Sequence, residues 1–404
     1  MTAHAPRFRD GLPAPAAPWV GNPRFNFVGG HNDAASLPVA DLTRAAAEAL
    51  AEEGAHLAMY FGDGGPLGHR GLRTFTAQAL QRRAGMACDP DQVLVVSGSL
   101  QALDLVNAAL LAPGDTVITE LETYGGALSR IRARGAEPVG VPTDDQGIVP
   151  QALDETLGRL SAEGRKPKYV YLIPTVQNPT GSVMPVARRR EILRLARTHD
   201  VTIFEDDCYA DLVFSGERPP AIRALDDEGR VIYCGSYSKS IAPGLRIGFL
   251  VADWPVLSRL VPLKTDAGTP ALEQMTLARF APGFDAHVSA LTKALEAKAR
   301  VMIEALDAQF GAAADYRMPE GGIFIWVTMP EGVDTSRLAQ AAAAEGVAIN
   351  PGAEWCADAA HGRRRFRLCF ANPEADVIRE GVAKLAEVCA REFGVPERRA
   401  NVAG

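Results

Sequence analysis

Short, almost continuously apolar runs alternate with amphipathic stretches through the middle of the chain. Seven of these runs predict strands, over residues 93–97, 116–119, 138–141, 169–173, 202–205, 231–234 and 247–251. Apolar side chains at successive positions are typical of strands that are covered on both faces. Between several of them lie amphipathic stretches, notably 101–111 and 186–199, which predict helices. The alternation predicts an α/β fold with a mostly parallel seven-stranded sheet and helices on both faces.

The pattern changes around Pro282 and Gly283. A long helix is predicted over 286–309, followed by strands at 323–327, 347–349 and 365–370 and helices at 336–345 and 374–393. These elements predict a smaller α+β domain. We therefore expect three parts: an N-terminal arm and a segment packing near the small domain (1–55), a large domain (56–283) and a small C-terminal domain (284–404).

Composition excludes some classes of function. The 404 residues carry a net charge of −7, which argues against a nucleic-acid or anionic-membrane surface. No apolar run approaches the length of a membrane span, and no signal peptide is evident at the N-terminus. The six cysteines are scattered without metal-ligand spacing, so we expect reduced thiols, a cytoplasmic location and no metal site.

Polar residues that could take part in catalysis or ligand binding follow the predicted strands. Ser99 follows the first strand and Asn178 the fourth. Asp206 follows the fifth strand and Lys239 the sixth. Loops after parallel strands gather at one sheet edge, where α/β proteins bind their ligands. The sequence therefore predicts a site at this edge.

The run Ser236-Tyr237-Ser238-Lys239-Ser240 is the most informative stretch. It places a lysine between hydroxyl residues, with Arg246 seven positions further on. Such a lysine suits an aldehyde cofactor held as a Schiff base, with the hydroxyls and the guanidinium around a phosphate. Four other stretches fit the same chemistry: Ser97-Gly98-Ser99-Leu100-Gln101, Glu122-Thr123-Tyr124, Gln177-Asn178-Pro179-Thr180-Gly181 and Glu205-Asp206-Asp207-Cys208-Tyr209.

Together these motifs resemble the pyridoxal 5′-phosphate (PLP) enzymes of fold type I. More narrowly, they resemble the class I/II aminotransferases of the 2-aminoadipate type, close to the effector domain of MocR-type regulators. The resemblance runs from about Phe27 to about Leu385. It implies a large PLP-binding domain and the transfer of an amino group from an α-amino acid to a 2-oxo acid, through the Lys239 Schiff base and pyridoxamine phosphate.

The resemblance assigns catalytic roles to Lys239, Asp206 and Tyr209. Lys239 holds the cofactor and moves the proton at the substrate α-carbon. Asp206 pairs with the pyridinium nitrogen; its neighbour Asp207 is a rival, but successive residues of a strand point to opposite faces. Tyr209 and Asn178 hydrogen-bond the phenolic oxygen of the cofactor.

The remaining cofactor contacts follow in the same way. The phosphate is expected at the start of the helix opened by Gly98, Ser99 and Leu100, where backbone N–H groups are free. Ser236, Ser238 and Arg246 would complete this phosphate site. Tyr124 would stack on the pyridine ring, although Glu122-Thr123 stands where the family usually has a proline nearby.

Tyr60 resembles the tyrosine that reaches the phosphate of a neighbouring subunit, which implies a homodimer with shared active sites. The glycine-rich run after it lacks the lysine ending of a nucleotide-binding loop. Arg367, flanked by apolar residues, is expected to bind the substrate α-carboxylate. Asn178 and Gly30 would also belong to the substrate pocket, and the residues after Gly30, 31–33, depart from the family's pattern.

Two alternatives remain open. The same residues serve other PLP-dependent lyases, decarboxylases, racemases and amino-acid oxidases. A MocR-like PLP sensor is the non-enzyme alternative, but only some 26 residues precede the first matching segment, too few for the usual DNA-binding domain. We expect an enzyme, with the amino donor left undetermined by the sequence.

Overall fold

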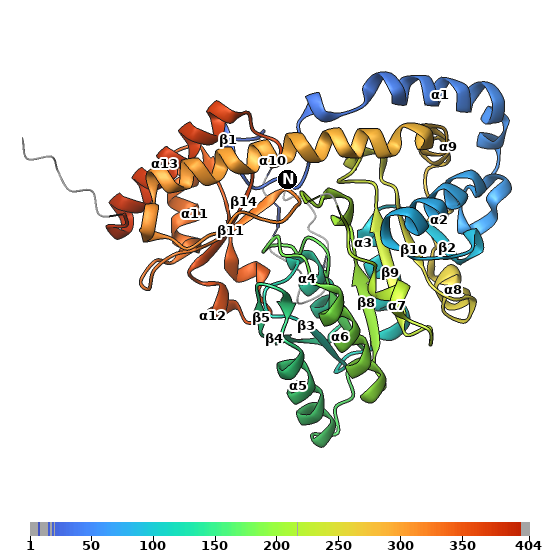
Figure 1. The fold of residues 1–404 in the computed structure, drawn as a ribbon, viewed down its shortest axis with the longest axis horizontal. Coiled ribbons are helices and arrows are strands. Elements are labelled where there is room, and N and C mark those ends of the chain that lie inside the picture. Colours follow the sequence, from blue (N-terminus) through green and yellow to red (C-terminus); the bar gives the residue numbers. More distant parts are fainter. Residues whose placement is uncertain (1–6, 9–14, 17, 20, 216, 397–404) are drawn as a thin grey trace, which may run out of the picture.

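The computed structural model describes residues 7–8, 15–16, 18–19, 21–215 and 217–396, and its fold is shown in Figure 1. Most of the expected N-terminal arm lies outside the described residues. No helix in the described parts of the chain is long and apolar enough to cross a membrane.

A seven-stranded sheet forms the centre of the larger part of the molecule. Its strands, in sheet order, are β2 (Val93–Val96), β10 (Gly248–Val251), β9 (Val231–Ser236), β8 (Thr202–Asp206), β7 (Tyr169–Leu172), β3 (Thr116–Glu120) and β4 (Glu137–Val141). Only β10 runs antiparallel to its neighbours. The predicted mostly parallel α/β sheet is therefore confirmed, and each strand overlaps one of the seven apolar runs.

Apolar residues at successive positions serve both faces of this sheet. In β7, Tyr169 and Tyr171 pack into one core with residues of α3 and α4. Val170 and Leu172 of the same strand pack into another core with residues of α5 and α6. The helices are α2 (Arg70–Ala84), α3 (Ser99–Leu110), α4 (Gly125–Ala133), α5 (Pro150–Ala162), α6 (Val186–Thr198), α7 (Ile222–Leu225), α8 (Trp254–Leu260) and α9 (Ala271–Phe280).

The C-terminal part forms a second, smaller sheet, at the left of Figure 1. Its three antiparallel strands are β11 (Phe324–Thr328), β14 (Arg365–Cys369) and β13 (Asn350–Pro351). The accompanying helices are α10 (Phe284–Gln309), α11 (Thr335–Ala344), α12 (Ala359–Gly362) and α13 (Ala375–Phe393). The predicted α+β composition of this part is confirmed.

The N-terminal segment contacts both parts. Strand β1 (Phe25–Asn26) pairs in parallel with β12 (Val347–Ala348) of the C-terminal part. Helix α1 (Val39–Glu53) lies along α9 of the larger part (Figure 1). The short hairpin of β5 (Thr143–Asp144) and β6 (Gly147–Ile148) was not predicted from the sequence.

Candidate active site

The loops after the parallel strands enclose a small cavity at the carboxyl edge of the large sheet, as the sequence predicts for an α/β protein. Its volume is about 120 Å³. The residues that line it are Ser99, Leu100, Tyr124, Ile173, Asn178, Asp206, Cys208, Tyr209, Ser238, Lys239, Pro243 and Arg246. Nine of them were singled out from the sequence; the other three, Ile173, Cys208 and Pro243, were not.

Lys239 follows β9 and points its amine into this cavity. Its Nζ donates to the carbonyl of Gly30 in the N-terminal segment, and Asn32 of that segment bonds the Lys239 carbonyl at 2.9 Å. Burial lowers the pKa of the amine, and the nearby guanidinium groups of Arg367 and Arg246 lower it further. The environment thus favours the neutral, nucleophilic amine.

The two neighbouring aspartates point to different surroundings. Asp206 ends β8 and lines the cavity. Its carboxylate accepts a hydrogen bond of 2.6 Å from the Tyr171 hydroxyl, and burial raises its pKa. Asp207 instead forms an ion pair of 2.7 Å with Arg218, away from the cavity lining.

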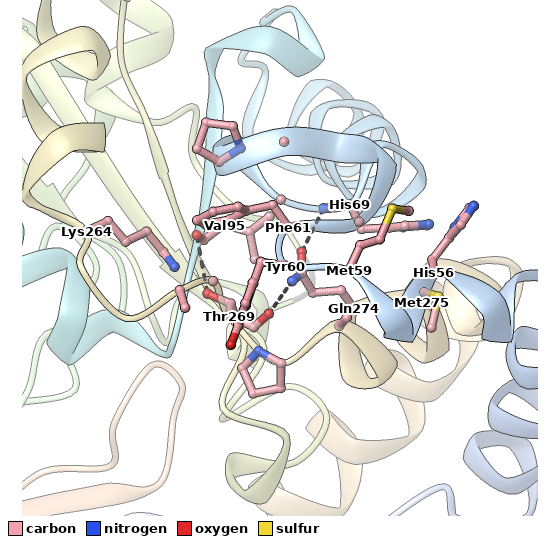
Figure 2. Close-up of a pocket in the computed structure, with 18 residues that line it drawn as sticks. His56, Met59, Tyr60, Phe61, His69, Val95, Lys264, Thr269, Gln274 and Met275 are labelled. Atoms are coloured by element: carbon pink, nitrogen blue, oxygen red, sulfur yellow. Dashed lines mark hydrogen bonds between the residues drawn. The ribbon is translucent and has the colours of Figure 1, made fainter.

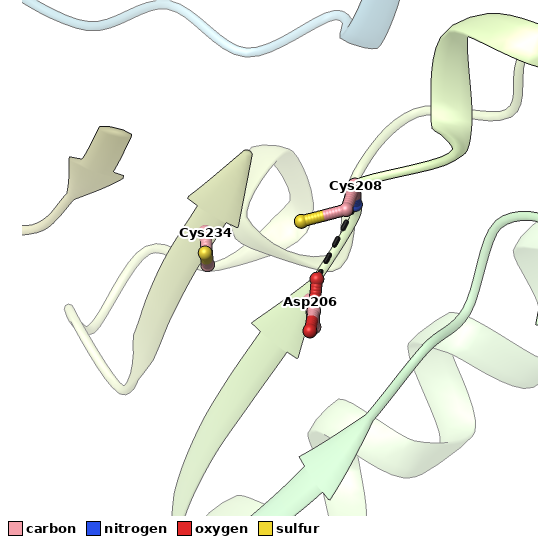
Figure 3. Close-up of side chains that lie close together, drawn as sticks. All are labelled: Asp206, Cys208 and Cys234. Carbon is pink, nitrogen blue, oxygen red and sulfur yellow. Dashed lines mark hydrogen bonds between the residues drawn. The ribbon is translucent and has the colours of Figure 1, made fainter. Parts of the chain in front are cut away.

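Asp206 also belongs to a buried cluster with two thiols, drawn in Figure 3. The ligand-type atoms of Asp206, Cys208 and Cys234 all lie within 4.8 Å of one another. Cys234 lies directly opposite Asp206 in the β8–β9 register. The hydrogen bond to Cys234, burial and the nearby Asp206 raise the pKa of the Cys208 thiol. The hydrogen bond from Cys208 lowers the pKa of Cys234, but burial and the acidic neighbours raise it on balance. Both therefore stay neutral, as small apolar packing groups beside the carboxylate.

The substrate-binding candidate Arg367 is held between two aromatic rings. Its Cζ lies 3.6 Å from the ring centroid of Phe324 and 3.6 Å from that of Trp355. One terminal nitrogen donates to Asn178 Oδ1 at 3.0 Å, and the other to Asn350 Oδ1 at 2.9 Å. Burial lowers the pKa of this guanidinium to about 10, so the group remains charged at neutral pH.

Asn178 links Arg367 to the tyrosine of the cavity. Its side-chain amide lies 3.5 Å from the hydroxyl of Tyr209. Burial raises the pKa of Tyr209 well above its ordinary value. The tyrosine therefore remains a protonated hydrogen-bond donor.

The predicted phosphate residues lie at the start of α3 and beside it. Gly98 is the residue before the helix, with φ 81°, and a side chain there would collide with the guanidinium of Arg246. Arg246 donates to the Ser97 carbonyl at 2.9 Å. Ser238 lines the cavity, whereas Ser236 accepts a hydrogen bond from the Ser238 N–H at 3.1 Å. The first residues of α3, the hydroxyl residue Ser238 and the guanidinium residue Arg246 thus all line the cavity, as a phosphate site requires.

Two further candidates complete the surroundings. Tyr124 precedes α4 and packs against Trp355, with 5.9 Å between the ring centroids. Gly30 lies beside the amine of Lys239, since a Cβ at this position would be 3.5 Å from Nζ.

Tyr60 does not line the cavity around Lys239. It lies at a separate surface pocket of about 170 Å³, shown in Figure 2 together with His69, Thr269 and Gln274. The side chain is 81% exposed, and the neighbouring Met59 and Phe61 are 55% and 41% exposed. A single chain therefore does not bring Tyr60 to the predicted phosphate site.

Comparison with known proteins decides the family. The model of the family "Aminotransferase class I and II" matches residues 30–385. The chain belongs to the class I and II aminotransferases. It is thus a PLP-dependent aminotransferase, and the predicted family and activity are confirmed.

Individual relatives of the chain include aminotransferases and a transcriptional regulator. A 2-aminoadipate transaminase of Thermus thermophilus is 34% identical over 89% of this chain and 89% of its own. A kynurenine aminotransferase of Pyrococcus horikoshii, solved with PMP, is 34% identical, covers 92% of both chains and superposes with a TM-score of 0.86. The HTH-type transcriptional regulator YisV of Bacillus subtilis is 32% identical over 81% of this chain and 66% of its own.

The cavity of this aminotransferase has the donor set that PLP requires. An amine, a carboxylate, a phenol and a guanidinium converge on it, from Lys239, Asp206, Tyr209 and Arg246. No carboxylate among the described residues forms a salt bridge with the buried Lys239 amine. The residues present therefore fit an aldehyde cofactor with an anionic group.

Proposed function

We propose that the cavity around Lys239 holds PLP and that the chain moves the amino group of an α-amino acid to a 2-oxo acid. The observation that carries the proposal is the buried amine of Lys239, bonded to the Gly30 carbonyl in a cavity that also presents Asp206 and Arg246. Its lowered pKa favours attack on an aldehyde at neutral pH.

Each residue then has a defined task. Arg246, Ser238 and the N–H groups at the start of α3, from Ser99 and Leu100, would bind the phosphate, while Asp206 would hold a proton on the ring nitrogen. Bound PLP supplies an electron-accepting ring for the charge left at the substrate α-carbon.

Other residues of the site would bind and orient the substrate. Arg367 would bind the α-carboxylate through its planar fork, fixing the orientation of the α-carbon. The Lys239 amine would then take and return the proton at that carbon. The Tyr209 hydroxyl and the Asn178 amide would donate to the phenolic oxygen, and Tyr124 would pack on the ring face.

A screen of amino donors tests this function. The purified enzyme with its cofactor is mixed with single amino acids, without an oxo acid, and the cofactor absorbance is recorded. Because names of relatives point to 2-aminoadipate and kynurenine, these two and the common aromatic and acidic amino acids form the panel. We expect stoichiometric conversion to the amino form by at least one donor, and reversal by a 2-oxo acid.

Two other outcomes of this screen would assign a different function. Release of carbon dioxide, a racemised amino acid or oxygen consumption, without conversion of the cofactor, would assign another PLP reaction. No spectral response to any amino acid would favour a sensor over an enzyme.

We also propose a homodimer in which Tyr60 completes the partner's phosphate site. Met59, Tyr60 and Phe61 line the pocket of Figure 2 and are exposed, as expected of an apolar surface that another chain covers. Two-fold symmetry would give each site one Tyr60 from the other chain. The three-part domain division and the cytoplasmic location expected from the sequence remain parts of this proposal.

Complementation in mixed dimers tests the shared site. One chain carries Lys239→Ala, the other Tyr60→Ala, and the two are co-expressed with different tags. If Tyr60 acts in the partner, one site of each mixed dimer has both residues intact, so about half of the wild-type activity per dimer returns. If Tyr60 acts in its own chain, neither site is complete, and the activity per dimer is about half that of the Tyr60→Ala parent, because only one of the two sites keeps Lys239.

PLP affinity gives a second measurement. Tyr60→Phe should weaken cofactor binding by about tenfold, the order of one charge-assisted hydrogen bond. The matched control is Tyr316→Phe, whose hydroxyl bonds Asp307 at 2.7 Å outside the site. Equal affinities for both variants and the wild type would contradict the phosphate role.

A further inference from the structure

Glu122 lies in the loop between β3 and the ring-stacking candidate Tyr124, where the sequence departs from the family pattern. Its side chain is buried, with 9% of the residue exposed. The carboxylate nevertheless makes three polar contacts with its surroundings. A buried carboxylate kept in such a place needs partners of this kind, because an unpaired charge away from water is costly.

The partners of Glu122 come from two different parts of the fold. Thr143 of the larger part donates to Oε2 at 2.6 Å. His361 of the C-terminal part bonds Oε1 at 2.6 Å, and Arg365 Nε lies 3.7 Å from the same oxygen. Although burial raises the pKa of Glu122, the hydrogen bonds from His361 and Thr143 lower it on balance, so the group is a carboxylate at neutral pH.

The backbone on both sides of Glu122 is bound to the same C-terminal segment, residues 352–365. Glu122 and Cys356 form an antiparallel bridge. The Thr123 N–H donates to the Trp355 carbonyl at 2.9 Å, and the Ala357 N–H to the Leu121 carbonyl at 2.9 Å. The Glu122 carboxylate thus binds the end of this segment through His361 and Arg365, while the backbone of its neighbours Leu121 and Thr123 binds Ala357 and Trp355.

The 352–365 segment is itself compact. Gly352 and Gly362 approach each other so closely that a Cβ on Gly352 would lie 2.6 Å from the Gly362 carbonyl oxygen. This close approach connects the part of the segment that holds His361 to the part that holds Trp355. Trp355 stacks on the guanidinium of Arg367 at 3.6 Å and packs against Tyr124 at 5.9 Å.

We propose that Glu122 is a positioning residue that fixes the 352–365 segment and thereby holds Trp355 over the carboxylate-binding Arg367. The inference rests on the proposed function only through the role of Arg367. Glu122 touches neither the cavity nor Arg367, so it acts through His361, Arg365 and Trp355. Without the Glu122 carboxylate, the guanidinium of Arg367 would be held less firmly. Binding of every amino acid and oxo acid would then weaken, since all carry an α-carboxylate.

The test compares Glu122→Gln, His361→Gln and the double variant with the wild-type holoenzyme. Glutamine keeps the volume of glutamate but removes the charge that His361 and Arg365 share. We expect KM to rise about tenfold in each single variant, the order of one charge-assisted hydrogen bond. The rise should be similar for donors of different side chains, with kcat nearly unchanged, because binding is lost equally in ground and transition states.

Coupling between the two residues separates this role from general damage. Because both single variants break the same hydrogen bond, the KM of the double variant should not exceed that of the more strongly affected single variant. His361 is partly exposed, so its variant should fold even if Glu122→Gln does not. Glu354→Gln is the matched control, since it removes an exposed carboxylate from the same segment and should leave KM unchanged.

Tryptophan fluorescence gives a readout that does not depend on turnover. The fluorescence of Trp355 is the part of the emission that is lost in Trp355→Phe. Acrylamide should quench this part more strongly in Glu122→Gln than in Glu354→Gln. Unchanged KM and unchanged quenching in both Glu122→Gln and His361→Gln would overturn the inference.

Arg367→Ala separates this failure from failure of the proposed function. A large rise in KM for Arg367→Ala, with none for Glu122→Gln or His361→Gln, would reject the positioning role of Glu122 and leave the proposed function intact. An unchanged KM for Arg367→Ala would instead reject the proposed carboxylate site.

Discussion

Replacing Lys239 by alanine will give a folded protein that attaches no reducible cofactor and transfers no amino groups. Lys239 is the only lysine among the residues that line the cavity, so no other amine can serve there. Its removal eliminates both the nucleophile and the base at the α-carbon, and we expect a rate loss of at least about a thousandfold. Borohydride reduction followed by peptide mass spectrometry will show the loss of the attached group.

The control for this variant is Lys298→Ala. The amine of Lys298 is bound to Asp33 and to the Ala371 carbonyl, outside the cavity. This variant should keep the borohydride-fixed group on Lys239. A fixed group on a different lysine, or amino transfer by Lys239→Ala within tenfold of the wild type, would falsify the assignment.

The large sheet could be predicted because its signals are local. Each strand has apolar side chains for both faces, and β7 shows why: Tyr169 and Val170 enter different cores. The site residues were found for a similar reason, since each motif directly follows a strand and parallel strands end at one edge. The direction of a strand within the sheet could not be predicted from local patterns. Nothing in residues 248–251 distinguishes β10, which is antiparallel to its neighbours, from the parallel strands.

Contacts between distant segments could not be predicted. Cys208 lies in the turn after β8 and Cys234 on β9, and the register of β8 with β9 places Cys234 beside Asp206. The sandwich of Phe324, Arg367 and Trp355 joins three elements of the C-terminal part and carries no local motif. The sequence shows that Glu122 departs from the family pattern. Only the structure shows that its carboxylate is bonded to His361.

The choice between Asp206 and Asp207 shows how structure sharpens a sequence argument. Alternation along a strand predicts that only one of the two faces the cofactor. Asp206 lines the cavity, while Asp207 is paired with Arg218 at 2.7 Å. The two carboxylates therefore have different expected roles, and isosteric amide variants should separate activity from stability.

Asp206→Asn should fold normally and lose at least about a hundredfold in rate. Burial raises the pKa of Asp206, which means that the charged form is disfavoured there, so a neutral amide costs little stability. Without the carboxylate, however, nothing in the cavity would hold a proton on the ring nitrogen. Loss of a desolvated charge pair typically amounts to about 3–5 kcal/mol, and about 2.7 kcal/mol already corresponds to a hundredfold in rate.

Asp207→Asn should show the reverse pattern. It leaves the buried Arg218 without its closest counter-charge, although the hydroxyl of Tyr233 still bonds the guanidinium at 2.7 Å. We expect the free energy of unfolding to fall by about 3 kcal/mol, with the rate at saturating cofactor changed by less than about tenfold, a difference of 1.4 kcal/mol in the barrier. Urea unfolding and kcat/KM, measured on both variants, compare the two effects directly. Equal and mild rate losses for the two variants would refute the role of Asp206 at the ring nitrogen, because only that role makes the neighbouring carboxylates unequal in catalysis.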